Sequence, residues 1–196
     1  MMRKAICGAV VLVHGAYHGG WCWREVAAML RGHGVEVFTP TLTGLGERGH
    51  LLTGDVCLST HVEDVVRVLR FEELDDVILV GHSYAGMVIT GVAQTIPERI
   101  ARLVYLDAYV PFVGECVFEF VPGVKERVSE SVVAGRNVEV LTPPEPQAFG
   151  VVEPKDVEWV SSKLTPMPCK CYSETVAIDN KAATQIPTTY LNAEIP

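Results

Sequence analysis

The 196-residue sequence contains few basic residues and no block of them. Lys and Arg total 16 against 24 Asp and Glu, which gives a formal net charge of -8 at pH 7. Proteins that bind a nucleic-acid backbone carry clustered Lys and Arg that neutralise phosphates. We therefore expect no nucleic-acid partner.

The sequence also lacks a long hydrophobic run. Its N-terminus, MMRKAICGAVVLVHG, places two basic residues before a short apolar run, as a signal peptide does. That run continues into His14 and Gly15 without a small-residue cleavage site, and it is far shorter than the roughly 20 residues that span a bilayer. We expect a first buried strand here, no membrane association and a cytoplasmic protein.

Closely spaced cysteine pairs of the metal-binding kind are absent as well. No C-x-x-C pair accompanies suitably spaced histidines, which argues against a zinc site or a disulfide framework. We expect reduced thiols, no metal and no organic cofactor. The six cysteines are scattered: Cys7, Cys22, Cys57, Cys116, Cys169 and Cys171.

What the sequence does contain is a series of short apolar runs with helical patterns between most of them. This alternation predicts a mostly parallel sheet with helices on both faces, in a single α/β domain over residues 1–196. A proline-rich texture at about 111–170 predicts an inserted cap, so the core comprises 1–110 and 171–196. The predicted strands are 9–13, 35–38, 77–80, 103–106 and 188–191.

Three helices are predicted between these strands. The first covers residues 23–31 and is stopped by glycines, and the third covers residues 84–96 and ends at Pro97. The second begins with a capping box formed by Thr60 and Glu63, which are three residues apart.

The stretch DDVILVGHSYAGMVITGV, which begins at Asp75, reads as strand, sharp turn and helix. A serine at such a turn has a strained backbone and an exposed hydroxyl, and the N–H of the following residue faces a developing oxyanion. This pattern makes Ser83 a candidate nucleophile and the Tyr84 N–H a candidate donor.

A second informative segment is VLVHGAYHGGWCWREV. Its glycine-containing loop directly follows a strand, so backbone N–H groups can point into the crevice where open α/β sheets bind ligands. The Ala16 and Tyr84 N–H groups would then hold one oxyanion together, each worth on the order of 3 kcal/mol in acyl transfer.

The motifs HGAYHGGWCW, VGHSYAG and LVYLDAYVP together resemble the α/β-hydrolase superfamily. The similar branch contains plant methyl-ketone and methyl-salicylate type esterases, hydroxynitrile lyases and bacterial relatives, and the resemblance covers residues 8–191. It implies Ser83 as nucleophile, Ala16 and Tyr84 as oxyanion hole, and hydrolysis of small carboxylic esters through an acyl-enzyme. Ala85 departs from the Gly-x-Ser-x-Gly pattern, and we expect it to be tolerated.

The resemblance implies a general-base histidine after the last strand, but no histidine follows Ser83 in this sequence. The final strand, the base-bearing loop and the terminal helix that the resemblance implies are likewise not expected within these residues. We interpret the sequence either as C-terminally truncated or as a natural short form without a complete triad. Loss of the histidine lowers kcat by about 10^6, while the oxyanion hole and binding keep about 10^3 to 10^4 over water. We therefore expect the chain to be nearly inactive, with a catalytic histidine not present.

All six histidines precede Ser83 in the sequence, and we predict roles other than general base for them. His82 cannot turn back onto the hydroxyl of its neighbour and is expected to pack locally. His14 and His18 are expected to shape the oxyanion loop, and His50 to line the pocket. The remaining two, His33 and His61, are interpreted as surface residues at helix ends.

Two carboxylates remain candidates for the triad acid. Asp107 ends the predicted strand 103–106, where some members of the superfamily carry the acid, and a structural role is equally compatible with its position. In the closer branch the acid follows the next strand, which makes Glu194 the positional match.

The substrate pocket is expected to be apolar. Tyr17, Trp21 and Trp23 could form one wall, although core packing is favoured for Trp23. The cap aromatics could cover an acyl or aromatic group, or simply pack within the cap. They are Phe112, Phe118, Phe120, Phe149 and Trp159.

Two other functions stay open. Lyases of this branch resemble the esterases but carry threonine where this chain has Gly15, which favours hydrolysis. A ligand-binding remnant that keeps the pocket without the chemistry is the alternative from another class. An unpaired sheet edge would also favour a homo-oligomer.

Overall fold

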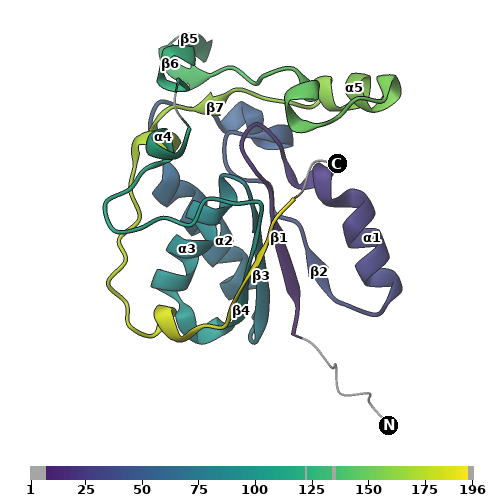
Figure 1. The fold of residues 1–196 in the computed structure, drawn as a ribbon, viewed down its shortest axis with the longest axis vertical. Coiled ribbons are helices and arrows are strands. Elements are labelled where there is room, and N and C mark those ends of the chain that lie inside the picture. The colour runs from purple at the N-terminus through teal and green to yellow at the C-terminus, as the bar shows by residue number, and fades with distance from the viewer. Residues whose placement is uncertain (1–7, 122, 134–135, 194–196) are drawn as a thin grey trace.

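The computed structural model describes residues 8–121, 123–133 and 136–193, and its centre is a parallel sheet of order β2-β1-β3-β4-β8 (Figure 1). Each strand overlaps one of the five predicted runs, which confirms the α/β fold. The strands are β1 (Val10–Val13), β2 (Val37–Phe38), β3 (Val77–His82), β4 (Ile100–Leu106) and β8 (Thr188–Leu191).

Helices cover both faces of this sheet. Figure 1 shows α1 on one side and α2 with α3 on the other. Alternate residues of β1 divide between the two faces: Val10 and Leu12 belong to the cluster that contains Ala27 of α1, and Val11 and Val13 belong to the larger core. Burial on both faces explains why β1 is a continuous apolar run. The three helices are α1 (Arg24–Gly32), α2 (Leu58–Phe71) and α3 (Ala85–Thr95).

The start of α2 differs from the prediction. The N-cap is Cys57, whose N–H donates to Thr60 Oγ1 at 3.3 Å, and Thr60 is the third helical residue. The predicted capping box of Thr60 and Glu63 is therefore wrong in register by three residues. Glu63 instead forms an ion pair with Arg67, with 2.8 Å between Oε1 and Nε.

Residues 111–170, the predicted cap segment, contain a second sheet that the sequence did not predict. Its strands are antiparallel in the order β5-β6-β7, and the segment lies past the carboxyl ends of the parallel strands (Figure 1). The elements after β4 are α4 (Val117–Phe120), β5 (Val128–Val133), β6 (Arg136–Leu141), α5 (Pro154–Ser161), β7 (Met167–Pro168) and α6 (Lys170–Ser173).

Short 3-10 turns connect several elements. In the described ranges, no helix has both the length and the apolar character needed to cross a membrane. The 3-10 turns are Gly20–Trp23, Gly46–Leu51, Pro97–Arg99, Lys125–Arg127, Pro146–Phe149 and Ala183–Gln185.

Candidate active site

Ser83 lies in the sharp turn between β3 and α3. Its φ of 53° is in the left-handed region, which costs a residue with a side chain about 1–2 kcal/mol. Three backbone hydrogen bonds hold this conformation: Ser83 N–H donates to Leu106 O at 3.3 Å, and Ser83 O accepts from Gly86 N–H at 3.0 Å and Tyr109 N–H at 3.1 Å. The strained serine predicted from the sequence is therefore present and firmly held.

Close packing around this turn depends on two glycines. A Cβ on Gly86 would lie 2.0 Å from Tyr109 O, and one on Gly81 would lie 2.7 Å from Ala85 O. Ala85 itself is fully buried without such a conflict. Alanine is accommodated at position 85, where the expected pattern has glycine, because the closest contact with the neighbouring backbone is made by Gly86.

A cavity of about 340 Å³ lies over the turn, between the core and residues of the cap segment. The core contributes Ser83, Ala16 and Tyr109 to its lining, and the cap segment contributes Arg127 and Phe149. The cavity thus brings the predicted nucleophile and the oxyanion loop together.

The two predicted oxyanion donors have free N–H groups. Within the described residues, neither the Ala16 N–H nor the Tyr84 N–H donates a hydrogen bond to the protein. An N–H without an internal partner beside a cavity can bind an anion without first breaking another bond. Tyr84 is fully buried and does not itself line the cavity, although the preceding residue, Ser83, does.

Three tyrosines add neutral phenols to the cavity. The Tyr109 phenol lies close enough to the Ser83 side chain, and the Tyr17 phenol to that of Tyr172, for each contact to affect the phenol pKa. Burial raises the pKa of all three phenols above their usual value. They stay protonated at neutral pH, so they can donate hydrogen bonds but cannot take a proton from the serine.

Two histidines line the cavity beside Ser83. His18 Nδ1 lies 2.8 Å from Ala16 O, and the His82 ring packs edge-on against Trp23 with 6.3 Å between centroids. Burial lowers the pKa of both imidazoles. Across the described ranges, no hydrogen bond joins a histidine to Ser83.

Two predictions about other histidines are wrong. His50 is exposed and lies outside the cavity lining, because it is in the 3-10 turn Gly46–Leu51. His61 is fully buried and not at the surface, because it lies on the inward face of α2 beside Tyr84. His33 is exposed at the end of α1, as expected.

The acid candidates are not part of the cavity as described. Asp107 is exposed directly after β4, with a φ of 44°, and its N–H donates to Leu191 O at 2.8 Å. It does not line the cavity, although its charge raises the pKa of His82 against the larger lowering by burial. Glu194 lies outside the described residues.

Tyr17 of the predicted wall and Phe149 of the predicted cap aromatics line the cavity, with 6.3 Å between their ring centroids. Trp21 instead packs edge-on against Trp159 at 5.0 Å, outside the lining. Trp23 is buried in the core.

Three cavity residues were not predicted from the sequence: Tyr109, Tyr172 and Arg127. Tyr109 lies within LVYLDAYVP, so its place after β4 could have indicated it. Arg127 follows no recognisable motif. For metals, no cluster of three or more His, Cys, Asp or Glu in the described part of the chain is arranged to hold an ion.

We expect the free energy of unfolding to fall by roughly 4 kcal/mol between pH 7 and pH 5 because of two histidines. Burial lowers the pKa of His14 from 6.5 to about 3 and that of His61 from 6.5 to about 4. Below pH 6.5 the two histidines bind protons in the unfolded chain but stay neutral in the folded chain. The contribution of these two histidines to the free energy of unfolding is therefore fully present above pH 6.5. It decreases as the pH falls toward the pKa values of the folded state.

Urea unfolding at the two pH values measures this effect. The His61→Gln variant lacks one titrating group, so its loss of stability between the two pH values should be smaller by about 2 kcal/mol. A stability that is equal at pH 7 and pH 5 in the unmodified protein would contradict the buried neutral state of these histidines.

Comparison with known proteins gives consistent matches. Residues 10–187 match the Alpha/beta hydrolase family. A carbendazim hydrolyzing esterase of Nocardioides sp. (strain SG-4G) is 46% identical over 170 residues, which are 83% of this chain and 70% of that protein. Methyl jasmonate esterase 1 of Vitis vinifera is 34% identical over 102 residues, covering 52% of this chain and 39% of that enzyme.

Among solved structures, an extracellular alpha/beta-hydrolase from a Paenibacillus species superposes with a TM-score of 0.79 at 29% identity. The match covers 94% of this chain and 76% of that one. Methylesterases are among the relatives of this chain. Because the family match spans most of the chain, the protein belongs to the alpha/beta-hydrolase family.

Proposed function

We propose that the protein hydrolyses small carboxylic esters, with Ser83 as nucleophile and the Ala16 and Tyr84 N–H groups as oxyanion hole. The relatives are named esterases, so family resemblance makes the protein a carboxylic ester hydrolase. The observation that carries the proposed site is the left-handed Ser83 on the lining of a cavity that Ala16 also lines. The N–H groups of Ala16 and Tyr84 have no acceptor among the described residues.

In this mechanism Ser83 Oγ attacks the ester carbonyl and forms a tetrahedral intermediate. The two N–H groups bind its oxyanion, the alcohol leaves, and water then releases the acid from the acyl-enzyme. The Tyr109 phenol lies beside the Ser83 side chain, where it can orient the hydroxyl, and it remains protonated throughout. No metal or organic cofactor enters these steps.

The proton of Ser83 needs an acceptor, and no described histidine is hydrogen-bonded to it. We propose that these 196 residues turn esters over slowly on their own, because the general base of a serine triad is worth about 10^6 in kcat. A small external base such as imidazole would then supply the lost proton transfer. Asp107 and Glu194 stay proposals for the acid.

The cavity suits a small substrate. Its volume of about 340 Å³ is near the lower end of the roughly 300–1,000 Å³ that is usual for ligand pockets. Within the proposed cap at 111–170, Phe149 offers an aromatic face and Arg127 a cation. We therefore propose compact esters with an aromatic or polar acyl part, and carbendazim and methyl jasmonate are suitable compounds to assay.

The lyase alternative is disfavoured by the space around Gly15. A Cβ on Gly15 would lie 3.1 Å from His82 Nδ1 and 3.2 Å from Ser83 Cβ. The threonine that the resemblance associates with lyases would crowd both neighbours.

Location and assembly are also proposals. The cysteines described are free thiols, which fits the reducing cytoplasm. In the described sheet β8 forms one edge, and an unpaired edge favours association of copies.

The proposed function is tested by measuring hydrolysis of p-nitrophenyl acetate and p-nitrophenyl palmitate at increasing imidazole concentration. We expect the catalysed rate to rise with imidazole for the acetate, and the palmitate to be a much poorer substrate because the cavity is small. Binding of esters without turnover at every imidazole concentration would instead support the binding-only alternative. Cyanide release from a cyanohydrin without ester cleavage would support the lyase.

A further inference from the structure

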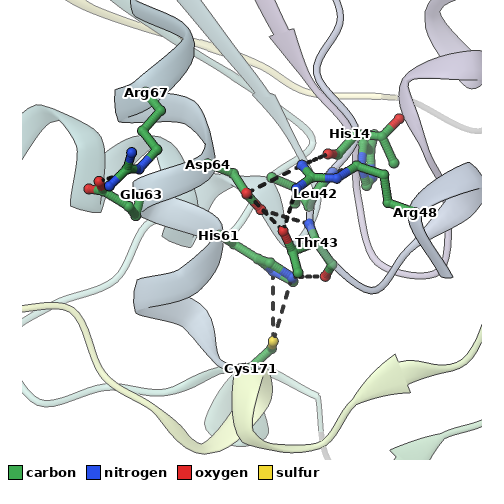
Figure 2. A network of polar contacts seen from close by, with 10 residues as sticks. His14, Leu42, Thr43, Arg48, His61, Glu63, Asp64, Arg67 and Cys171 are labelled. Carbon is green, nitrogen blue, oxygen red and sulfur yellow. Dashed lines mark hydrogen bonds and ion pairs between the residues drawn. The ribbon is translucent and has the colours of Figure 1, made fainter. Parts of the chain in front are cut away.

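Two buried histidines form hydrogen bonds with consecutive residues of one loop. The loop comprises residues 41–43 and follows β2, and we call it the anchor loop. His14 Nε2 accepts a hydrogen bond from Leu42 N–H at 3.0 Å, and His61 Nε2 lies 2.9 Å from Thr43 O. Figure 2 shows both imidazoles meeting the anchor loop from different elements. Both rings are fully buried.

The partners of each ring determine its tautomer. His14 Nδ1 lies 2.8 Å from Gly15 O, which can only accept, so Nδ1 carries the hydrogen and Nε2 is free to accept from Leu42. For His61 the order is reversed. Thr43 O requires the hydrogen on Nε2, and Nδ1 then accepts from the Tyr84 hydroxyl at 2.9 Å. Each ring is a neutral imidazole that uses one donor and one acceptor.

These contacts connect the anchor loop to both donors of the proposed oxyanion hole. His14 lies two residues before Ala16 on the same turn, and His61 holds the side chain of Tyr84. We infer that His14 and His61 are positioning residues, which fix the Ala16 and Tyr84 N–H groups relative to each other through the anchor loop. This inference rests on the proposed function in assigning the oxyanion to those two groups.

The anchor loop is itself held rigidly. Asp64 of α2 accepts from Thr43 N–H at 2.6 Å and from Thr43 Oγ1 at 2.8 Å. Arg48 donates to Thr41 O and to Thr43 Oγ1, both at 2.8 Å, and lies 3.3 Å from the Asp64 carboxylate (Figure 2). The Asp64 side chain is only 14% exposed, so water screens this network weakly.

The charges near His61 leave the ring neutral. Burial outweighs the opposing effects of Asp64 and Glu174, which favour the charged form, while Arg48 disfavours it. Cys171 Sγ lies 3.7 Å from Nδ1, and burial raises the pKa of this thiol, so it adds no charge. The donor and acceptor pattern described above therefore persists at neutral pH.

A spectroscopic experiment on the ligand-free protein tests the inference. Side-chain ¹⁵N spectra should show the Nδ1–H tautomer for His14 and the Nε2–H tautomer for His61. Asp64→Asn loosens the anchor loop, so the amide resonances of both Ala16 and Tyr84 should shift, although Asp64 forms no hydrogen bond with either among the described residues. Thr43→Val, a milder change to the same contact, should shift them in the same direction by less.

The matched control is Tyr105→Phe. It removes a buried phenol hydroxyl that bonds Thr90 Oγ1 at 2.8 Å, and Tyr105 does not line the cavity. The control should leave both amides in place, whereas Tyr84→Phe should shift the Tyr84 amide. Reversed tautomers, or amide shifts no larger in Asp64→Asn and Thr43→Val than in the control, would overturn the inference.

A kinetic readout separates this inference from the proposed function. In the imidazole-supplemented assay we expect Asp64→Asn to lower kcat about tenfold or more with little change in KM, since one whole oxyanion donor is worth about 10^2 to 10^3. An equal kcat in Asp64→Asn and the control would overturn positioning. If the unmodified protein hydrolyses no ester even with imidazole while the amides shift as expected, the proposed function fails and the coupling stands.

Discussion

Replacing Ser83 with alanine is expected to abolish the imidazole-dependent ester hydrolysis that exceeds the rate with imidazole alone, and to change the rate without imidazole very little. Components of a serine triad act as a unit. Because no described histidine is hydrogen-bonded to Ser83, removing the nucleophile should add little loss when no external base is present. With imidazole present, the unmodified protein can form the acyl-enzyme and the variant cannot. The measurement is the initial rate with p-nitrophenyl acetate for both proteins across a range of imidazole concentrations.

The control for this prediction is Ser162→Ala, which removes an exposed hydroxyl that donates to Trp159 O at 2.7 Å and does not line the cavity. It should keep the full imidazole dependence. A large loss on Ser83→Ala without imidazole would show that a histidine of this chain already acts as base. His18 and His82 would be the candidates, because both line the cavity.

Gly86→Ala is expected to destabilise the protein by roughly 3 kcal/mol and to remove its imidazole-dependent hydrolysis. The added Cβ would lie 2.0 Å from Tyr109 O, so one of two backbone segments must move. Tyr109 N–H donates to Ser83 O, and its phenol lies beside the Ser83 side chain. A shift of this segment therefore displaces the serine. Urea unfolding gives the stability, and the same ester assay gives the activity.

Gly32→Ala is the matched control. Gly32 is the last residue of α1, and a Cβ there would meet no atom within 4 Å. Alanine should stabilise the protein slightly, by about 0.5–1 kcal/mol, because it restricts the unfolded chain. Equal stability effects of the two substitutions would contradict the close packing of α3 against the segment after β4.

The features that the sequence predicted correctly are those encoded locally. The apolar run before Gly81 gives a buried strand, and the turn at Ser83 follows from that strand meeting a small-residue helix. Five strands were found because each is a short apolar run between breakers. Cys57 was missed as the N-cap of α2 because cysteine is not among the side chains that commonly cap helices.

What the sequence could not predict depends on contacts between distant residues. His61 looked like a surface residue because its partners, Thr43 and Tyr84, are 18 and 23 positions away. The antiparallel sheet of the cap segment was hidden by prolines and short patterns. Arg127 reaches the cavity only because that segment folds over the core.

The most direct test of the central claim, that Ser83 is the nucleophile, is to locate a covalent label. The 196-residue protein is incubated with a fluorophosphonate in imidazole buffer, digested and analysed by peptide mass spectrometry. We expect one phosphonyl group per chain, on Ser83, and none on the Ser83→Ala variant. A label on another residue, or equal labelling of the variant, would contradict the claim.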